Sequence, residues 1–384
     1  MVGASRDTAV MASAPADARA VLEIDLDALS ANWKKLTELA GPAECAGIVK
    51  ADAYGLGLEE VSTALTDAGC RTFFVATLGE GRRVRAVQPG AQVFILDGLL
   101  PGACEHYAGF DLTPVLSSVP EVVEWAEFCR RSNRRYPAAL HVDTGMHRLG
   151  ILADEYRGLT STAGPLDDFD VTLVMSHLAC ADEPGTGMNR EQRQLFDELR
   201  QLLPNSRASL ANSGGVFLGQ DFHYDLVRPG IALYGGRAFS GAPNPMQAVV
   251  TLSARILQVH KADIGDTVGY GASFAVTRPS RIATIACGYA DGFLRALGGE
   301  SSRPGPVGYI GSHEVRIVGR VSMDLITLDV TDVPAELAQR GHWVEVMGQR
   351  TTVDDLTDRA GTIGYELLSR LSQRVHRSYV RKDC

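Results

Sequence analysis

The sequence predicts an α/β protein in which an N-terminal (β/α)8 TIM-type barrel is followed by a mostly antiparallel β domain. Three observations carry this prediction. Short apolar runs alternate with segments of helical spacing from Leu22 to about Tyr234, which is typical of parallel strands joined by helices. Eight such runs fit into this stretch, and that number favours a closed barrel over an open sheet. After residue 246 the apolar runs alternate with polar residues and are divided by Gly, Asp and Pro turns, which indicates antiparallel strands.

The eight runs are short and bounded by glycine or polar residues, as expected of buried parallel strands. Segments such as 57–69 and 119–133 lie between them and place apolar residues at i, i+3, i+4 and i+7, which predicts helices. No GxGxxG motif follows the first run, which argues against a dinucleotide-binding fold. The predicted strands lie within residues 45–50, 72–77, 92–98, 112–118, 138–145, 172–180, 207–214 and 226–235.

A segment rich in Gly, Pro and Ser at residues 235–246 divides the chain. We expect residues 1–19 to form a flexible N-terminal tail, residues 20–246 the barrel and residues 247–384 the β domain. Two short helices are expected near the C-terminus, at 352–361 and 363–372. The predicted strands of the β domain lie within residues 249–259, 280–289, 306–311, 313–330 and 342–348.

The composition excludes several classes of partner. A net charge of −9 and a pI near 5.5 argue against nucleic acid and anionic membrane surfaces. No apolar stretch is long enough to span a membrane, and the first eighteen residues lack the pattern of a signal peptide. Seven scattered cysteines without a CxxC pair or a Cys/His cluster fit reduced thiols and no metal site. We therefore expect a cytoplasmic protein.

Lys50 follows five mostly apolar residues at the end of the first predicted strand. In a barrel of this kind, the carboxyl ends of the strands build the active site. A lysine desolvated there has a lowered pKa and can form an imine with an aldehyde. The alternative is a lysine that extends its amine to solvent or pairs with a carboxylate.

The last two predicted strands end in groups suited to phosphate. Ser213 follows the seventh, and Arg228, Gly230 and Ile231 follow the eighth. Barrels often bind phosphate at the loops after these strands, through hydroxyl and backbone N–H donors. An imine-forming lysine and a phosphate site in one barrel suggest pyridoxal 5′-phosphate.

Nine segments in order resemble the motifs of the alanine racemases, the fold-type III pyridoxal-phosphate enzymes, and they cover residues from about 20 to 380. The resemblance implies a barrel, a C-terminal β domain and a homodimer with composite active sites. It also implies interconversion of L- and D-alanine, for peptidoglycan synthesis or for catabolism. The segments are VKADAYGLG, HVDTGMHRLG, SHLACADE, ANSGG, VRPGIALYG, VGYGASF, IACGYADGF, VGRVSMDLI and GYELLSRLSQRVHR.

The resemblance also assigns roles to residues. Lys50 matches the lysine that holds the cofactor and acts as one base, and Tyr270 matches the opposite base, contributed by the partner subunit. A phenol has a pKa of about 10 and needs cationic or hydrogen-bonding neighbours to act as a base. His177 beside Arg228 matches that network.

Arg228 also matches the arginine that faces the pyridine nitrogen. Since arginine cannot accept a proton, the nitrogen would stay unprotonated, which should suppress side reactions such as transamination. The remaining matches are the phosphate ligands Tyr54, Ser213, Gly230, Ile231 and Tyr365, the substrate-carboxylate ligands Arg148 and Met323, and the entrance residue Tyr289. Asp324 is expected to orient local backbone or to pair with a cation.

Two positions depart from the family pattern. His141 stands where many relatives have a carbamylated lysine that supports the substrate arginine, and Leu56 stands where relatives often have histidine. We expect a bound anion, a water or His141 itself to position Arg148 in place of the carbamate.

Other functions remain open at this point. The first alternative is a broader racemase that acts on serine or lysine. A decarboxylase of the same barrel class would not need the VGYGASF segment, and a non-catalytic pyridoxal-phosphate protein would not need the β domain.

Overall fold

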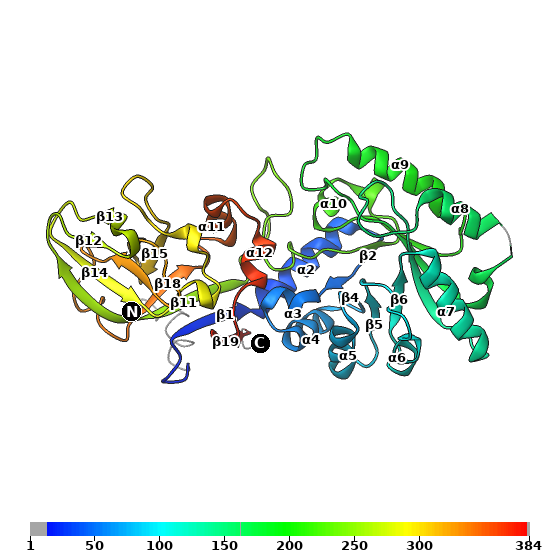
Figure 1. Cartoon of the computed structure of the whole chain (residues 1–384), viewed down its shortest axis with the longest axis horizontal. Helices are drawn as coiled ribbons and strands as arrows, with labels where there is room; N and C mark the ends of the chain where they lie inside the picture. Colours follow the sequence, from blue (N-terminus) through cyan, green and yellow to red (C-terminus); the bar gives the residue numbers. More distant parts are fainter. Residues whose placement is uncertain (1–13, 162, 382–384) are drawn as a thin grey trace. The chain divides into compact units, whose positions relative to one another are not determined.

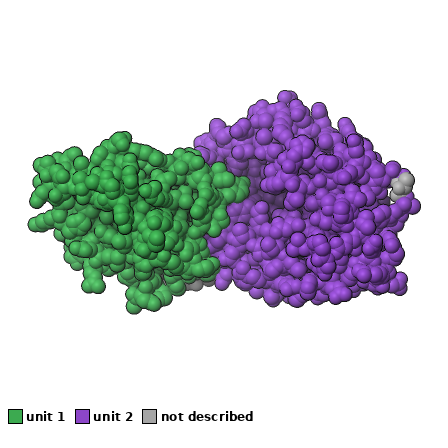
Figure 2. All heavy atoms as spheres, in the orientation of Figure 1, with its two compact units in different colours: residues 1–28, 234–236, 247–384 green, residues 29–233, 237–246 purple. Residues whose placement is uncertain are grey.

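The structure, a computed structural model, describes residues 14–161 and 163–381. It divides into two compact units (Figure 2). We call the described residues of 29–233 and 237–246 the barrel unit. We call residues 14–28, 234–236 and 247–381 the β unit. The expected tail lies mostly outside the described residues, which begin at residue 14.

Parallel strands form the barrel, and all eight predicted runs contain one. Strands β3 to β9 pair in chain order as a seven-stranded sheet. The eighth run supplies β10, whose residues Leu226 and Val227 pair with Glu44 and Cys45 of β2. Since β2 directly precedes β3, this pairing joins the last run to the first. The strands are β2 Glu44–Cys45, β3 Gly47–Ile48, β4 Thr72–Val75, β5 Gln92–Ile95, β6 Thr113–Leu116, β7 Pro137–His141, β8 Asp170–Met175, β9 Arg207–Ser209 and β10 Leu226–Val227.

Helices connect these strands and cover their outer side, as α4 to α7 show in Figure 1. The predicted helices at 57–69 and 119–133 are present as α4 and α7. Their apolar faces are buried, with Val61 and Leu65 on one and Val122 and Trp125 on the other. The helices are α2 Leu26–Ala40, α4 Leu58–Ala68, α5 Leu78–Val87, α6 Cys104–Gly109, α7 Val119–Arg131, α8 Ala153–Ser161, α9 Met188–Arg200 and α10 Ser213–Phe217.

The β unit is built on one sheet with the order β14-β17-β16-β15-β18-β11-β1-β19. The long strand β11 also pairs with β14, so six of these strands form a ring. Two helices follow near the C-terminus where they are predicted, α11 Val353–Ala360 and α12 Gly364–Ser369. The strands are β1 Ala20–Asp25, β11 Val250–Ala262, β14 Ser280–Ile285, β15 Val307–Ile310, β16 His313–Ile317, β17 Ile326–Asp329, β18 Trp343–Met347 and β19 His376–Val380.

The start of the chain departs from the predicted domain boundary. Residues 20–28 were assigned by sequence to the barrel, but β1 belongs to the sheet of the β unit. It pairs antiparallel with β11 and parallel with β19. The apolar side chains Val21, Leu22 and Ile24 are buried there. A lone apolar strand at the N-terminus has no local signal that says which sheet it joins, because its pairing partners lie far along the chain.

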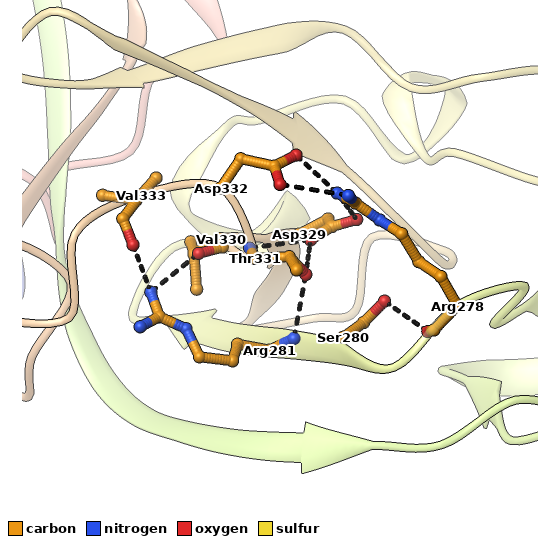
Figure 3. A network of polar contacts seen from close by, with 8 residues as sticks. All are labelled: Arg278, Ser280, Arg281, Asp329, Val330, Thr331, Asp332 and Val333. Atoms are coloured by element: carbon orange, nitrogen blue, oxygen red, sulfur yellow. Dashed lines mark hydrogen bonds and ion pairs between the residues drawn. The ribbon is translucent and has the colours of Figure 1, made fainter.

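A polar network secures one turn of the β unit (Figure 3). The guanidinium of Arg281 donates hydrogen bonds to the carbonyl oxygens of Val330 at 2.8 Å and Val333 at 2.7 Å. The backbone N–H of Arg281 donates to the Thr331 hydroxyl at 2.9 Å, and Arg278 pairs with Asp332. These contacts hold the turn after β17 against β14.

No helix within the described residues is both long and apolar enough to cross a membrane.

Candidate active site

Lys50 lies at the carboxyl end of β3, where the sequence places it. The side chain is partly buried, and this burial lowers its pKa. The nearby charge of Arg148 lowers the pKa further, whereas the carboxylates of Asp97 and Glu80 raise it. Since the net effect is a lowered pKa, a larger fraction of the amine is uncharged and nucleophilic than in a free lysine.

The chain turns in an unusual way directly after this lysine. The short helix α3, Lys50–Gly55, is left-handed at residues 51–54, with φ values from 53° to 58°. None of these four residues is glycine, and the left-handed conformation costs about 1–2 kcal/mol for each of them. Strain of this kind persists only where the surrounding structure enforces it. The turn begins at Lys50 and carries Tyr54 at its end, so it fixes both side chains relative to the barrel.

Tyr54 and the loops after β9 and β10 form a compact polar cradle. The Ser213 hydroxyl accepts hydrogen bonds from the N–H groups of Gly230 at 2.7 Å and Ala232 at 3.3 Å. A Cβ on Gly230 would lie 2.2 Å from the Tyr54 hydroxyl oxygen, so only glycine permits this approach. Ile231 is fully buried in the same turn. The structure thus brings together all four phosphate candidates of the barrel unit.

Arg228 is buried beneath this region. Its guanidinium donates hydrogen bonds to the Ser209 hydroxyl, to the carbonyl oxygen of Ser176 at 2.6 Å and to that of Leu210 at 3.4 Å. Its carbon lies 6.0 Å from the centre of the Phe74 ring. Burial lowers the pKa of Arg228 to about 9, so the group stays charged at neutral pH. The oxygens that it meets are uncharged, which leaves its charge available to a ligand.

Two histidines lie among these cationic groups. Burial, with help from Arg228 and Arg148, lowers the pKa of His177 well below its usual value. Burial and Arg228 likewise lower the pKa of His141 to about 4. Both imidazoles are therefore neutral at pH 7 and can accept or donate hydrogen bonds. The Nδ1 atom of His141 lies 3.5 Å from the Ser117 hydroxyl.

The buried His141 should make the stability of the protein depend on pH. Its pKa is about 4 in the folded chain, against about 6.5 in an unfolded one. Between these values the unfolded chain binds more protons, so the free energy of unfolding falls as the pH drops from 6.5 to 4. We expect a loss of up to about 3 kcal/mol from this residue. Denaturant titrations at both pH values should show a smaller loss for His141→Gln than for the unchanged protein, and equal losses would contradict the prediction.

Gln192 is a buried residue that the sequence analysis missed. Its Oε1 accepts the N–H of Ala179 at 2.8 Å, and its Nε2 donates to the carbonyl oxygen of His177 at 2.9 Å and to the Thr144 hydroxyl at 3.2 Å. Thr144 in turn lies 2.8 Å from the Ser176 hydroxyl. The amide therefore ties together the loops that carry His177 and Arg148. The available signal was a polar residue among the apolar positions of the segment that forms α9.

The remaining candidates lie in the β unit. Tyr270 begins the short 3-10 helix Tyr270–Ala272 and is 72% exposed. Tyr289 and Met323 are neighbours, because the N–H of Tyr289 donates to Ser322 and that of the following residue donates to the Met323 carbonyl oxygen at 2.9 Å. Tyr365 lies on α12. All four side chains are exposed within this chain. The predicted pairing of Asp324 with a cation is also present, since its carboxylate lies 2.7 Å from Arg374 Nη2.

Comparison with known proteins gives one consistent family. The model for the alanine racemase N-terminal domain matches residues 24–238, and that for the C-terminal domain matches residues 249–379. The chain is 47% identical over 366 residues to the alanine racemase of Rhizobium meliloti (strain 1021), covering 94% of this chain and 96% of the relative. It is 48% identical over 364 residues to that of Rhodospirillum rubrum, covering 94% and 96%.

Solved structures agree with these matches. Alanine racemase from Bartonella henselae, described with covalently bound pyridoxal phosphate, superposes with a TM-score of 0.88 at 39% identity, covering 94% of this chain and all of that chain. The biosynthetic alanine racemase from Pseudomonas aeruginosa gives a TM-score of 0.84 at 32% identity, covering 95% and 100%. The predicted fold and family are thereby confirmed. The chain belongs to the alanine racemase family.

Proposed function

We propose that this protein interconverts L- and D-alanine with pyridoxal 5′-phosphate held at the carboxyl ends of the barrel strands. The observation that carries the proposal is the joint placement of an amine of lowered pKa, Lys50, and a polar cradle formed by Tyr54, Ser213 and Gly230. One end of this arrangement suits an aldehyde and the other suits a phosphate.

The residues fit this cofactor in kind and in position. The turn that starts at Lys50 ends at Tyr54, whose hydroxyl meets the backbone of Gly230. Lys50 would hold the cofactor covalently, and Tyr54, Ser213, Gly230, Ile231 and Tyr365 would contact its phosphate. When bound, the cofactor withdraws electrons and stabilises negative charge on the substrate Cα. Arg228 would face the ring nitrogen and, because it cannot accept a proton, would leave that nitrogen unprotonated.

Racemisation needs a proton removed from one face of Cα and delivered to the other. We assign these steps to Lys50 on one face and Tyr270 on the other, with Tyr270 supplied by the partner subunit of a homodimer. The high exposure of Tyr270 within its own chain supports this assignment. A side chain that completes the active site of another subunit should not be buried within its own subunit. His177, next to the charged Arg228, would support the phenolate.

Substrate binding falls to three further residues. Arg148 would bind the alanine carboxylate as a charged fork, together with the backbone of Met323, and Tyr289 would narrow the entrance. The adjacency of Tyr289 and Met323 supports a shared role.

The six cysteines among the described residues are free thiols, which supports a cytoplasmic location.

Chiral chromatography tests the proposal directly. Purified protein supplied with pyridoxal phosphate should convert L-alanine and D-alanine to the same equal mixture. Serine and lysine, tested in parallel, measure the alternative of a broader racemase. If serine or lysine is converted faster than alanine, that amino acid is the preferred substrate and the proposal of alanine is wrong. Cofactor binding without conversion of any amino acid would favour a non-catalytic pyridoxal-phosphate protein.

A further inference from the structure

Helix α5, which follows strand β4 of the barrel, begins with a capping box. The hydroxyl of Thr77 accepts the N–H of Glu80 at 3.3 Å. In return, Oε2 of Glu80 accepts the N–H groups of Ala76 at 3.0 Å and Thr77 at 3.2 Å. These bonds satisfy the N–H groups of Ala76, Thr77 and Glu80 at the start of the helix, and they occupy one carboxylate oxygen of Glu80.

The other carboxylate oxygen reaches the neighbouring loop. Oε1 of Glu80 accepts the backbone N–H of Asp52 at 3.2 Å. Asp52 is the second of the four left-handed residues that follow Lys50. The Asp52 side chain is held separately, since it pairs with Arg83 at 2.6 Å and accepts the N–H of Leu58 at 3.2 Å. Glu80 therefore supports the main chain of the turn, while Arg83 supports its side chain.

The left-handed turn needs such support because L-residues do not hold this conformation on their own. Main-chain bonds such as that from the N–H of Ala53 to the carbonyl oxygen of Val49 at 2.9 Å join the turn to adjacent residues of the chain, whereas the bond to Glu80 holds it from a separate element, α5. Release of the Asp52 N–H would let the turn relax toward ordinary conformations. Both Lys50 and Tyr54 would then lose their positions, because they lie at its two ends.

We propose that Glu80 is a positioning residue of the active site: its carboxylate locks the left-handed turn through the Asp52 N–H, and thereby places the Lys50 amine and the Tyr54 hydroxyl for one cofactor. The inference rests on the proposed function for the identity of that cofactor. The carboxylate is also near enough to Lys50 to raise the pKa of its amine, which supports the proximity.

The protein offers a way to separate helix capping from turn support. On α11, an aspartate in the same position completes a capping box, since Asp355 Oδ2 accepts the N–H of Thr352 at 2.9 Å. Glu80→Asp should therefore keep the cap, but its side chain is one methylene too short to reach Asp52 as well.

A matched control lies two strands further along. Glu121 of α7 accepts the N–H of Ser117 at 2.5 Å, and its own N–H donates to Ser118. Its carboxylate also accepts a backbone N–H from Leu99 in the preceding loop. Glu121→Asp thus shortens a carboxylate in the same way at the start of a comparable helix. The loop that Glu121 supports is not the one that carries Lys50.

The experiment compares the three proteins by hydrogen–deuterium exchange and by titration with pyridoxal phosphate. In Glu80→Asp, the peptide covering residues 51–54 should exchange about tenfold faster or more, and the cofactor should bind about tenfold more weakly or worse. Glu121→Asp should match the unchanged protein in both measurements. Equal behaviour of the two variants would overturn the inference.

Two further readouts keep the result interpretable. Thermal unfolding should show that both variants fold. If Glu80→Asp does not fold, Glu80→Met, which keeps the side-chain length but has no acceptor oxygen, should show the same exchange and binding changes, with Glu121→Met as its control. Equal behaviour of these two variants would overturn the inference. Failure of the unchanged protein to bind the cofactor would reject the proposed function, while faster exchange at residues 51–54 would still report on the role of Glu80.

Discussion

Lys50→Ala is expected to lower the rate of alanine racemisation by at least about 10⁴-fold, because the variant loses both the covalent attachment of the cofactor and one of the two bases. No other described lysine lies at the carboxyl end of a barrel strand. The alanine side chain has no amine that could bind the aldehyde or carry the proton.

The measurement is the initial rate with L-alanine at saturating pyridoxal phosphate, together with the absorption spectrum. The variant should also lose the absorption band of covalently bound cofactor near the visible edge. Lys261→Ala, which removes an exposed lysine from β11, is the control and should leave the rate and the spectrum unchanged. A Lys50→Ala protein with more than about a tenth of the normal rate would contradict the assignment.

Tyr270→Phe is expected to lower racemisation by about 10²- to 10⁴-fold, the usual contribution of a positioned acid or base. Since L- and D-alanine have equal free energies in water, kcat/KM must fall equally in both directions. The difference between the two enantiomers should appear instead in the exchange of the Cα proton in deuterium oxide. One enantiomer should still exchange its Cα proton through Lys50, while the other should lose exchange along with racemisation. Equal retention of exchange by both enantiomers would remove Tyr270 from the mechanism.

Hybrid dimers test the origin of Tyr270. In a dimer of one Lys50→Ala chain and one Tyr270→Phe chain, one of the two composite sites has both bases and the other has neither. Random pairing of the co-expressed chains should therefore restore about a quarter of normal activity. The absence of recovery above the two separate variants would place Lys50 and Tyr270 of each site in the same chain.

The alternation of short apolar runs and helical segments was sufficient to predict the barrel, because each strand and each helix carries its own local period. The strand ends at Lys50, Ser213 and Gly230 were predictable for the same reason. The assignment of β1 was wrong because its partners, β11 and β19, lie more than 200 residues away, and an isolated apolar strand carries no information about long-range pairing.

The fine structure of the site was less predictable. Nothing in the residues Ala51, Asp52, Ala53 and Tyr54 indicates a left-handed turn, since such turns usually contain glycine. We attribute the turn to its contacts with α5, the helix that follows β4. In the sequence, Glu80 of this helix is recognisable only as the last residue of a capping box. Gln192 was overlooked because a glutamine on a helix is usually exposed.

The most direct test of the account is reduction of the cofactor-loaded protein with borohydride, followed by mass spectrometry of its peptides. The account predicts one modified peptide, with a reduced pyridoxyl phosphate group on Lys50 and on no other lysine. Modification of a different lysine, or none at all in protein that racemises alanine, would contradict it.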